Sequence, residues 1–217
     1  MDRRRSLSEL DHRVLDHIGR LRFVTATHLA YWCDVVRVTI DRRLERLLTL
    51  GLVKAEKTSR PFIFFLTSAG AVMTGRPPAS GGHQASWSVM AHACHAVELE
   101  IQLHQDRGFR LLDRMHLLRQ GFNPAHGEHA GVDRTRQSTF VLLDDYGMQS
   151  DRIAHVWQRR HTPNNKYWPD PTGRVWGEVV HRYVVATTDP VQAQKHRAFI
   201  EDRGVVADVV DIKALWS

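Results

Sequence analysis

The segment FFLTSAG at residues 64–70 decides the fold of the first third of this chain. We expect it to be an apolar strand that ends in Thr-Ser-Ala-Gly. A polar turn with Lys57 and Arg60 precedes it, and residues 52–56 supply a second apolar strand before that turn. Further upstream, apolar residues recur at helical spacing in three successive stretches, which predicts three helices. Three helices followed by a hairpin, here over residues 8–70, are the element order of a winged helix-turn-helix.

Boundary signals mark the predicted helices. Ser8 followed by Asp11 resembles a capping box that opens the first helix. A second helix is predicted over residues 27–32 and a third over residues 36–50, and Gly51 follows the third as a C′ glycine. The third helix has four apolar residues on one face: Ile40, Leu44, Leu47 and Leu48.

The third helix carries polar residues on its remaining faces. In a helix-turn-helix, the second helix of the motif enters the major groove with its amino terminus first. We therefore expect Arg37, Thr39 and Arg43 to contact base edges, because an arginine can donate two hydrogen bonds to one guanine. Any single arginine of this helix could instead pair with Asp41 or Glu45 on a solvated face.

Other basic residues are candidates for phosphate contacts. We expect Arg42 and Arg46 to hold phosphates from the third helix. Lys57 and Arg60 at the hairpin tip could reach the DNA backbone or a minor groove, where inserted arginine senses groove width. The hairpin could also be a passive strand pair that covers the helices. The arginines at residues 3–5 are either a phosphate-binding arm or a solubilising tail.

The net charge is concentrated in the same part of the chain. Residues 1–76 hold fourteen Lys and Arg against eight Asp and Glu, whereas residues 77–217 hold sixteen of each. The whole net charge of +6 therefore lies in the first third. A positive surplus on one small domain is typical of phosphate binding, because each neutralised phosphate releases counterions. An ordinary solvated basic surface is the simpler alternative.

Composition is that of an ordinary globular protein. Of the 217 residues, 42% are hydrophobic and 25% are charged, and the length suits one large domain or two small ones. The two cysteines, Cys33 and Cys94, fall in different predicted domains, so we expect no disulfide framework. No apolar run approaches the roughly 20 residues of a membrane-spanning helix, and from the polar residues at the start we expect no signal peptide. We expect a cytoplasmic protein without membrane contact.

Residues 75–85 have linker composition, with Pro and Gly and no bulky apolar residue. The sequence therefore predicts a DNA-binding domain at residues 1–74 and a second domain at residues 86–217. In the second domain we expect helices and strands in the following order: helix 86–107, strands 109–112 and 139–143, helix 150–160, strand 175–186, helix 190–203 and strand 205–212. Residues 120–138 are rich in Gly and His and are expected to be a loop. This order predicts a small α/β domain, and the whole chain is expected to be α+β.

The histidines are candidate metal ligands, since eleven of the fourteen follow residue 80. Four possible ligands share one predicted helix: His92, Cys94, His95 and Glu98. Two histidines one helical turn apart are a plausible geometry for zinc. No further cluster stands at zinc-finger spacing, and the group at residues 126–129 is equally isolated. We expect no metal and no cofactor.

A pair of acidic residues suggests a nuclease site. A nuclease of the restriction-endonuclease-like type holds Mg²⁺ with two carboxylates on adjacent strands and needs a lysine two residues after the second. Asp170 and Glu178 could be the carboxylates, but position 180 is Val180, and the nearest polar residues are His181 and Arg182. We therefore expect a degraded restriction-endonuclease-like fold without catalytic residues. Asp170 is equally well explained as a turn residue that starts a hairpin.

Several of these features together resemble the replication-relaxation family of plasmid-borne winged-helix proteins. They are the FLTSAG segment at residues 65–70, the linker, a helix that begins near Trp87 and carries His92 and residues 98–100, and the Pro-Asp pair at residues 169–170. The order also resembles mobilisation proteins that have a restriction-endonuclease-like second domain. The resemblance implies action on plasmid or mobile-element DNA, in replication control, transfer or autoregulation.

The predicted function is sequence-specific binding of double-stranded DNA by a transcriptional regulator without catalytic activity. The second domain would serve homodimerisation or contact with a protein partner. A dimer would place two recognition helices roughly 34 Å apart on a palindromic site. Two alternatives stay open. One is a Mg²⁺-dependent enzyme of a plasmid transfer system that nicks or cleaves DNA with Asp170 and Glu178, and the other is a DNA-binding adaptor in a replication or transfer complex.

Overall fold

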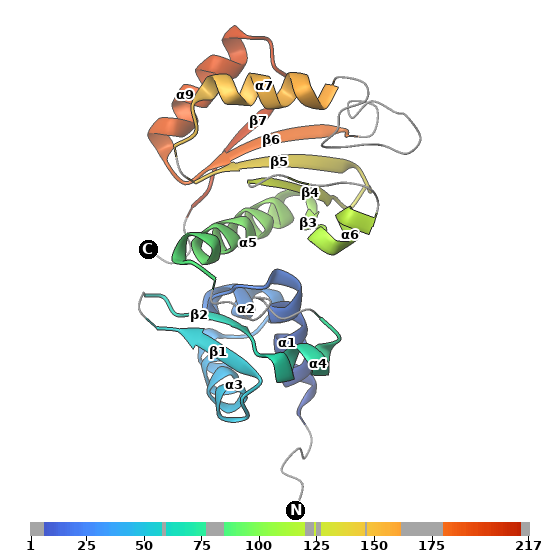
Figure 1. Cartoon of the computed structure of the whole chain (residues 1–217), viewed down its shortest axis with the longest axis vertical. Helices are drawn as coiled ribbons and strands as arrows, with labels where there is room; N and C mark the ends of the chain where they lie inside the picture. Colours follow the sequence, from blue (N-terminus) through green and yellow to red (C-terminus); the bar gives the residue numbers. More distant parts are fainter. Residues whose placement is uncertain are drawn as a thin grey trace, which may run out of the picture. The chain divides into compact units, whose positions relative to one another are not determined.

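The computed structural model describes the following residues: 7–57, 60–76, 85–119, 124, 127–145, 147–161 and 180–213. Within them lie eight helices and two sheets, one of two strands and one of five, so the fold is a mixed α+β fold. The chain divides into two compact units, an N-terminal unit up to Val97 and a C-terminal unit from Glu98 (Figure 1). None of the described helices combines the length and the hydropathy that crossing a membrane requires.

The N-terminal unit begins with the three helices that the sequence predicts: α1 (Glu9–Leu21), α2 (Ala26–Cys33) and α3 (Arg37–Thr49). Capping boxes open the first two, because the hydroxyls of Ser8 and Thr25 accept hydrogen bonds from the backbone amides of Asp11 and His28. Each helix buries its apolar face: Val14, Leu15, Ile18, Leu29, Ile40, Leu44 and Leu47. Leu48, which the periodicity assigns to the same face of α3, is only partly buried. The helix-turn-helix prediction is confirmed at the level of the fold.

The predicted wing is a two-stranded hairpin. Its strands are β1 (Val53–Glu56) and β2 (Ile63–Leu66), and they pair antiparallel. Val24, between α1 and α2, adds an antiparallel bridge to Phe64 of β2. The two residues exchange backbone hydrogen bonds of 3.1 and 2.7 Å. This bridge fixes the hairpin to the helices.

The prediction that Thr-Ser-Ala-Gly ends a strand is wrong, because this sequence begins the helix α4 (Ser68–Thr74). Thr67 is its N-cap, and the Thr67 hydroxyl accepts from the amide of Gly70 at 3.1 Å. The same hydroxyl donates to the carbonyl oxygen of Gly51 at 2.7 Å. Gly70 is required here, since an added Cβ would overlap the carbonyl oxygen of Leu52. A threonine that caps a helix therefore competes with strand formation at this point.

The two units divide within one helix, α5 (Trp87–Arg107), at Val97. The sequence instead predicts the boundary in the linker at residues 75–85, of which residues 77–84 lie outside the described part. A core cluster of the N-terminal unit explains the difference by joining four buried side chains: Phe23, Ile63, Met90 and Cys94. The first half of α5 therefore completes the core of the N-terminal unit.

The C-terminal unit is built on a five-stranded sheet with the strand order β3-β4-β5-β6-β7. Its strands are β3 (Arg110–Leu111), β4 (Glu128–Val132), β5 (Ser138–Asp144), β6 (Arg182–Thr187) and β7 (Asp208–Asp211). The first three pair antiparallel, and the last three pair parallel. Its remaining helices are α6 (Arg114–Arg119), α7 (Ser150–His161) and α9 (Pro190–Asp202). Helices α7 and α9 occur where the sequence predicts them, and α6 is an addition.

The expected loop at residues 120–138 is wrong in part, because it contains β4. Gly and His favour a loop locally, but β4 forms because it pairs along its whole length with β5. The ring of Phe109 lies against the backbone of Gly131, where a Cβ would overlap it. The glycine therefore permits close packing within the sheet rather than a turn.

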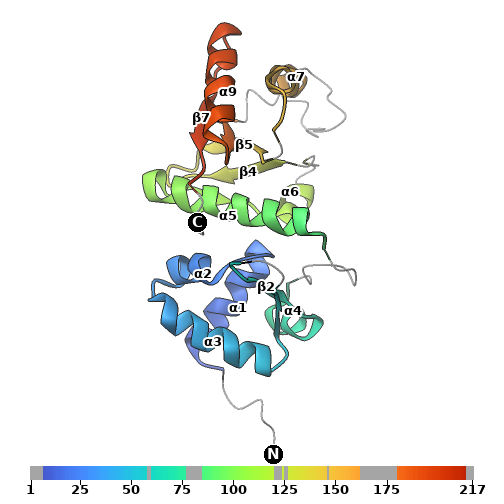
Figure 2. The same cartoon turned by 90° about the vertical axis from the view of Figure 1, so that its left-hand side faces the viewer.

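The parallel half of the sheet places two helices on one face. The crossovers β5-α7-β6 and β6-α9-β7 move in the same direction along the sheet, so α7 and α9 lie together (Figures 1 and 2). Eight buried residues form the core under them: Phe140, Leu142, Ile153, Val156, Tyr183, Val185, Ile200 and Val205. The part of α5 from Glu98 on covers the other face. The carboxyl ends of β5 and β6 therefore meet at one edge, beside the start of α7 and α9.

Candidate nucleic-acid interface

The amino terminus of α3 is the least capped helix start of the helix-turn-helix. Three residues join α2 to α3, and Asp34 among them takes the left-handed conformation with φ of 51°. Val36 is the N-cap, and it makes no side-chain capping hydrogen bond. The first turn of α3 also contains no acidic residue. The Thr39 amide donates to the carbonyl oxygen of Val36 at 3.0 Å, and the rest of this helix start, with the positive end of the dipole, is available to an external anion.

Two valines at this helix start are unusually exposed. Val36 exposes 70% of its surface and Val38 exposes 59%. Sequence reasoning missed both as functional candidates, although a valine at an N-cap position is itself a signal, since it cannot cap the helix. Apolar side chains in the first turn of such a helix can contact the methyl group of thymine.

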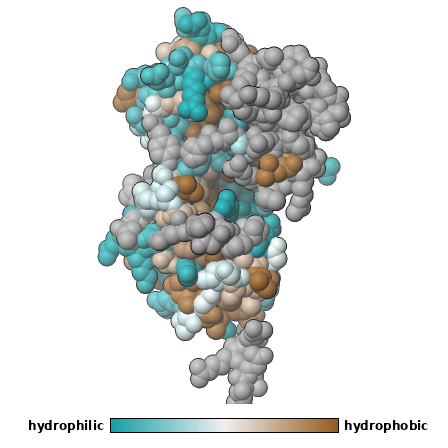
Figure 3. Space-filling view, viewed as in Figure 1, coloured by the Kyte–Doolittle hydropathy of each residue, from teal (hydrophilic) through white to brown (hydrophobic). Residues whose placement is uncertain are grey.

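These valines belong to a surface of mixed character. The N-terminal unit exposes several large apolar side chains: Val36, Val38, Leu50, Phe62, Val72, Met73, Trp87 and Val89. Figure 3 shows hydrophobic residues of this unit interspersed with hydrophilic ones on the face that it presents. Val36 and Val38 differ from the others because they lie at the start of the second helix of the helix-turn-helix, at an N-cap without a side-chain hydrogen bond.

Arg37 links the two helices of the motif. Its Nη1 donates to the hydroxyl of Thr27 on α2 at 3.1 Å, and its Nε lies 3.8 Å from Asp41 Oδ2, one turn along α3. Both members of the ion pair are about half exposed. Exposed pairs of this kind contribute little to stability, so Arg37 can exchange Asp41 for a phosphate at low cost.

Arg43 and Arg46 share one acidic partner on α1. Arg43 Nη1 lies 3.7 Å from Asp11 Oδ1, and Arg46 Nη1 lies 3.4 Å from Asp11 Oδ2. The Asp11 carboxylate is fully buried and also accepts from the backbone amide of Ser8 at 2.8 Å. The structure thus brings these two predicted site residues together on the flank of α3 that faces α1.

Arg42 lies on the outward face of α3. It stands two positions from the buried Ile40, which is about 200° round the helix. Val38 precedes it by four residues, so the two exposed side chains lie on one face, one turn apart. Among the described residues, Arg42 has no hydrogen-bond or ion-pair partner. Thr39, beside this face, is half-buried.

The hairpin presents further cations. Lys57 and Arg60 flank its tip and are both exposed, and residues 58–59 between them lie outside the described part. Lys54 on β1 is also exposed, and sequence reasoning did not single it out. The wing therefore carries positive charge, and among the described residues no buried acid holds it as Asp11 holds Arg43 and Arg46.

The other predicted candidates are not assembled into a site. Within the described ranges, no group of three or more His, Cys, Asp and Glu side chains is arranged to hold a metal ion. Cys94 is buried, and its Sγ donates to the carbonyl oxygen of Phe23 at 3.7 Å. Burial raises the pKa of the other thiol, Cys33, above its ordinary value. Asp170 and Glu178 lie outside the described residues.

Comparisons with known proteins give only distant likenesses. No protein-family model matches this chain, and no curated protein matches it significantly. One similar structure is FabT of Streptococcus pneumoniae in complex with DNA, with 21% identity over 34% of this chain and 54% of FabT and a TM-score of 0.31. The match thus spans about half the length of FabT.

Two further likenesses cover most of the chain. They are the O-methyltransferase NcsB1 of neocarzinostatin biosynthesis with S-adenosyl-L-homocysteine, and PigF with the same ligand. Identities are 14% and 12% over 94% of this chain, covering 67% and 66% of those proteins, and both TM-scores are 0.21. Scores this low decide neither fold nor function. The resemblance to the replication-relaxation family stays a prediction, and the geometry of α3 and the wing has to carry the functional argument.

Proposed function

We propose that this chain binds double-stranded DNA with sequence preference and inserts the amino terminus of α3 into the major groove. One observation carries the proposal: Val38 and Arg42 form an exposed row that starts at a helix terminus without a side-chain cap. Phosphates and the acceptor atoms of base edges suit such a terminus, and the lack of an acidic first turn removes repulsion from phosphates. The excess of positive charge in residues 1–76 supports the same role.

The roles within α3 follow from what each side chain already contacts. Arg42 reads a base edge, because it is outward-facing and no described partner holds it. Val38 contacts a thymine methyl group, with Thr39 beside it. Arg37 and Arg43 contact or steer phosphates. This reverses the roles that the sequence predicts for Arg42 and Arg43, and it moves Arg37 from base edges to phosphates. The reason is Asp11, which holds Arg43 at 3.7 Å on the flank of the helix.

The wing contributes sequence-independent affinity. Lys57 and Arg60 contact the DNA backbone or a minor groove next to the site of α3, and Lys54 adds a third cation. Arg43 and Arg46 share the buried Asp11, so both are less available for phosphate than Arg37, whose partner Asp41 is exposed. Contacts to phosphates position a protein on the duplex, whereas contacts to base edges specify the sequence.

The wider role is regulatory. We propose a homodimeric, cytoplasmic transcriptional regulator that controls genes of a plasmid or mobile element, with the C-terminal unit serving dimerisation or a protein partner. The balanced charge of residues 77–217 supports a protein contact there rather than a second phosphate surface. The link to mobile elements rests on the resemblance of the sequence to the replication-relaxation family.

Selection of preferred sites from a random duplex pool tests the proposal, with the mass of the bound complex measured in parallel. We expect a consensus with two half-sites about one helical turn apart and two chains per duplex. The Val38→Ala variant should lose preference at one A·T position, whereas Val72→Ala, an exposed valine on α4, should select the wild-type consensus. Recovery of random sequences from the wild-type protein would overturn the proposal.

A further inference from the structure

A polar cluster outside the DNA-binding surface lies at the carboxyl edge of the parallel sheet. Asp144, the last residue of β5, stands in register with Thr187, the last residue of β6. Ser150 begins α7, and His196 lies in the second turn of α9. The fold therefore brings a serine, a histidine and an aspartate to one edge, although 52 positions separate the aspartate from the histidine.

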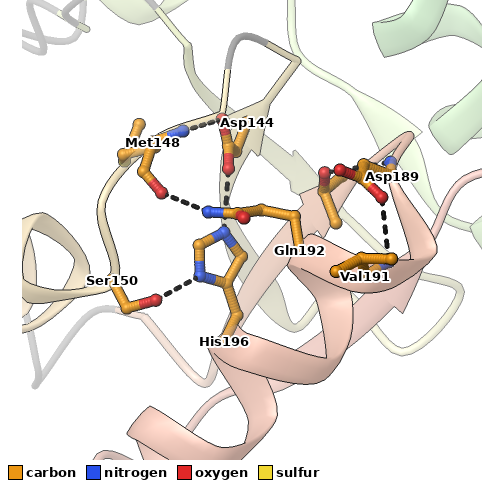
Figure 4. Close-up of polar contacts among 8 residues, drawn as sticks. Asp144, Met148, Ser150, Asp189, Val191, Gln192 and His196 are labelled. Carbon is orange, nitrogen blue, oxygen red and sulfur yellow. Dashed lines mark hydrogen bonds and ion pairs between the residues drawn. The ribbon is translucent and has the colours of Figure 1, made fainter.

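Both ring nitrogens of His196 are engaged (Figure 4). Its Nε2 lies 2.8 Å from Asp144 Oδ2, and its Nδ1 lies 3.0 Å from Ser150 Oγ. His196 is fully buried and Asp144 is almost so, whereas Ser150 is only half-buried. The serine is thus the member of the cluster that solvent can reach.

The aspartate is fixed by a second hydrogen bond. Its Oδ1 accepts from the backbone amide of Met148 at 2.6 Å. Met148 is held in turn by Gln192 on α9, whose Nε2 donates to the Met148 carbonyl oxygen at 2.6 Å. Figure 4 shows these contacts around His196. The Asp144 carboxylate therefore cannot turn away from the imidazole without losing its hydrogen bond to the Met148 amide.

This arrangement sets the protonation of the neutral imidazole. An ionised carboxylate accepts hydrogen bonds only, so the imidazole must carry its proton on Nε2. Its Nδ1 then offers a lone pair, and the Ser150 hydroxyl must be the donor in the 3.0 Å contact. A hydroxyl that donates to an imidazole oriented by a carboxylate is the arrangement that activates a nucleophilic serine.

Attack by Ser150 on an acyl group would place negative charge on the carbonyl oxygen of that group, and the start of α7 bears on this charge. The serine stands at the start of α7, where the helix dipole is positive, and the acidic Asp151 in the same turn offsets part of that positive potential. Three residues before it, Gly147 has φ of +74° and open space where a side chain would stand. Gly147 is exposed, so the chain before the half-buried Ser150 borders on solvent.

We propose that Ser150, His196 and Asp144 form an acyl-transfer site that hydrolyses small activated carboxylic esters. Ser150 Oγ bonds to the acyl carbon as the carbon–oxygen bond to the alcohol breaks, and the serine proton passes to His196 Nδ1 and then to the departing alkoxide. Water next attacks the acyl-serine and gives its proton to the same nitrogen. The carboxylic acid leaves, and Ser150 recovers its proton. Asp144 acts as a positioning residue.

The chain contains its own comparison for this chemistry. Ser138 Oγ, at the amino end of the central strand β5, lies 3.1 Å from Nδ1 of the exposed His181. Within the described part of the chain, no carboxylate contacts His181. That nitrogen also receives the backbone amide of Ser138 at 3.3 Å, so its lone pair is already used. Ser138 should therefore react no faster than an ordinary serine.

Covalent labelling of the full chain with diisopropyl fluorophosphate, read by intact mass and peptide mapping, tests the proposal. We expect one adduct per chain, on Ser150 and not on Ser138. The variants His196→Gln and Asp144→Asn should slow labelling on the order of 10²-fold or more, because each removes the base or its orientation. Hydrolysis of p-nitrophenyl acetate should fall in parallel.

Wild-type protein that gives no adduct on Ser150, or that labels Ser138 equally, would overturn the proposal. The proposal would also be overturned if Asp144→Asn still unfolds cooperatively and its Ser150 is labelled as fast as in the wild type. If the three residues only hold α7 and α9 together, the variants should unfold at a lower temperature and the wild-type protein should not react with the reagent. Binding of the selected duplex should be the same for wild type and Ser150→Ala, so this test is independent of the DNA-binding proposal.

Discussion

Arg46 on α3 and Asp11 on α1 form an ion pair of 3.4 Å in which the carboxylate is fully buried and the arginine side chain stays 42% exposed. The same carboxylate pairs with Arg43 and closes the capping box of α1 through Ser8. One buried acid thus ties the start of α1 to the flank of α3. This acid adds a polar tie between α1 and α3 to the apolar packing of Ile40, Leu44 and Leu47.

Replacing Asp11 by alanine should therefore destabilise the protein by about 2 kcal/mol, because the variant loses a helix cap and the partner of two arginines. Asp16 on the same helix is the matched control. It pairs with Arg76 at 3.2 Å but is exposed, so Asp16→Ala should cost about 0.5 kcal/mol or less. Urea unfolding of both variants checks the difference, and equal losses would show that Asp11 has no special role.

Arg42 and Arg43 differ in what they contact, and their alanine variants should differ accordingly. Arg42→Ala should relax base preference at one position by about 1–3 kcal/mol, because a bidentate contact to a base edge is lost. Arg43→Ala should keep the wild-type preference and bind all duplexes slightly more weakly. Anisotropy titrations with the selected site and single-base variants separate the two. If only Arg43→Ala relaxes the base preference, Arg43 contacts the base edge and Arg42 contacts phosphate, as the sequence predicts.

Gly70 should tolerate no side chain. Gly70→Ala places a Cβ against the backbone carbonyl of Leu52, so either α4 or the segment before the wing must shift. We expect a loss of more than about 2 kcal/mol. Gly75 ends the same helix with φ of +65° and has open space around its Cβ position, so Gly75→Ala should cost about 1 kcal/mol from backbone strain alone. Thermal unfolding of the two variants measures this order, and the reverse order would contradict the packing of α4.

The turn between β4 and β5 should respond to acid. The Thr135 hydroxyl, with the amides of Gln137 and Thr135, holds the pKa of Asp133 below its ordinary value. A lowered pKa means that the folded protein binds fewer protons than the unfolded chain. Its contribution to stability is therefore present above the unfolded pKa, about 3.9, and is lost as the pH falls through the folded pKa.

Thr135→Val removes the hydroxyl donor and should raise the pKa of Asp133 toward the ordinary value. NMR titration of the Asp133 carboxyl carbon checks this directly. The same Asp133 pKa in the wild type and Thr135→Val would show that the backbone amides, not the hydroxyl, hold the charge.

Local signals in the sequence were sufficient for the helices and the wing. Ser8 and Asp11 are three residues apart, and the apolar face of α3 repeats every three or four residues, so neither needs distant contacts to be recognised. The start of α4 was missed although Thr67 is a good helix cap, because the apolar run before it favoured a continued strand. β4 was missed because its strand conformation depends on pairing with β5, which no local pattern reveals.

The candidate sites depend even more than β4 does on contacts between residues that are distant in the sequence. Composition and helix periodicity place Arg42 and Arg43 on the third helix and turn Arg42 away from Ile40, but the ion pair that holds Arg43 joins it to Asp11 on another helix. Likewise Ser150 and His196 are separated by 46 positions and meet only because α7 and α9 lie on one face of the sheet. Chemistry that depends on such pairs cannot be predicted from spacing.

The central claim is that the outward face of α3 distinguishes bases in a duplex. Fluorescence anisotropy of the full chain on its selected duplex, at physiological ionic strength and with heparin or an unrelated duplex as competitor, tests it most directly. We predict that either competitor is at least about 10³-fold weaker than the unlabelled selected site. If heparin or the unrelated duplex displaces the probe as well as the selected site does, the protein is only a polyanion binder and the claim is contradicted.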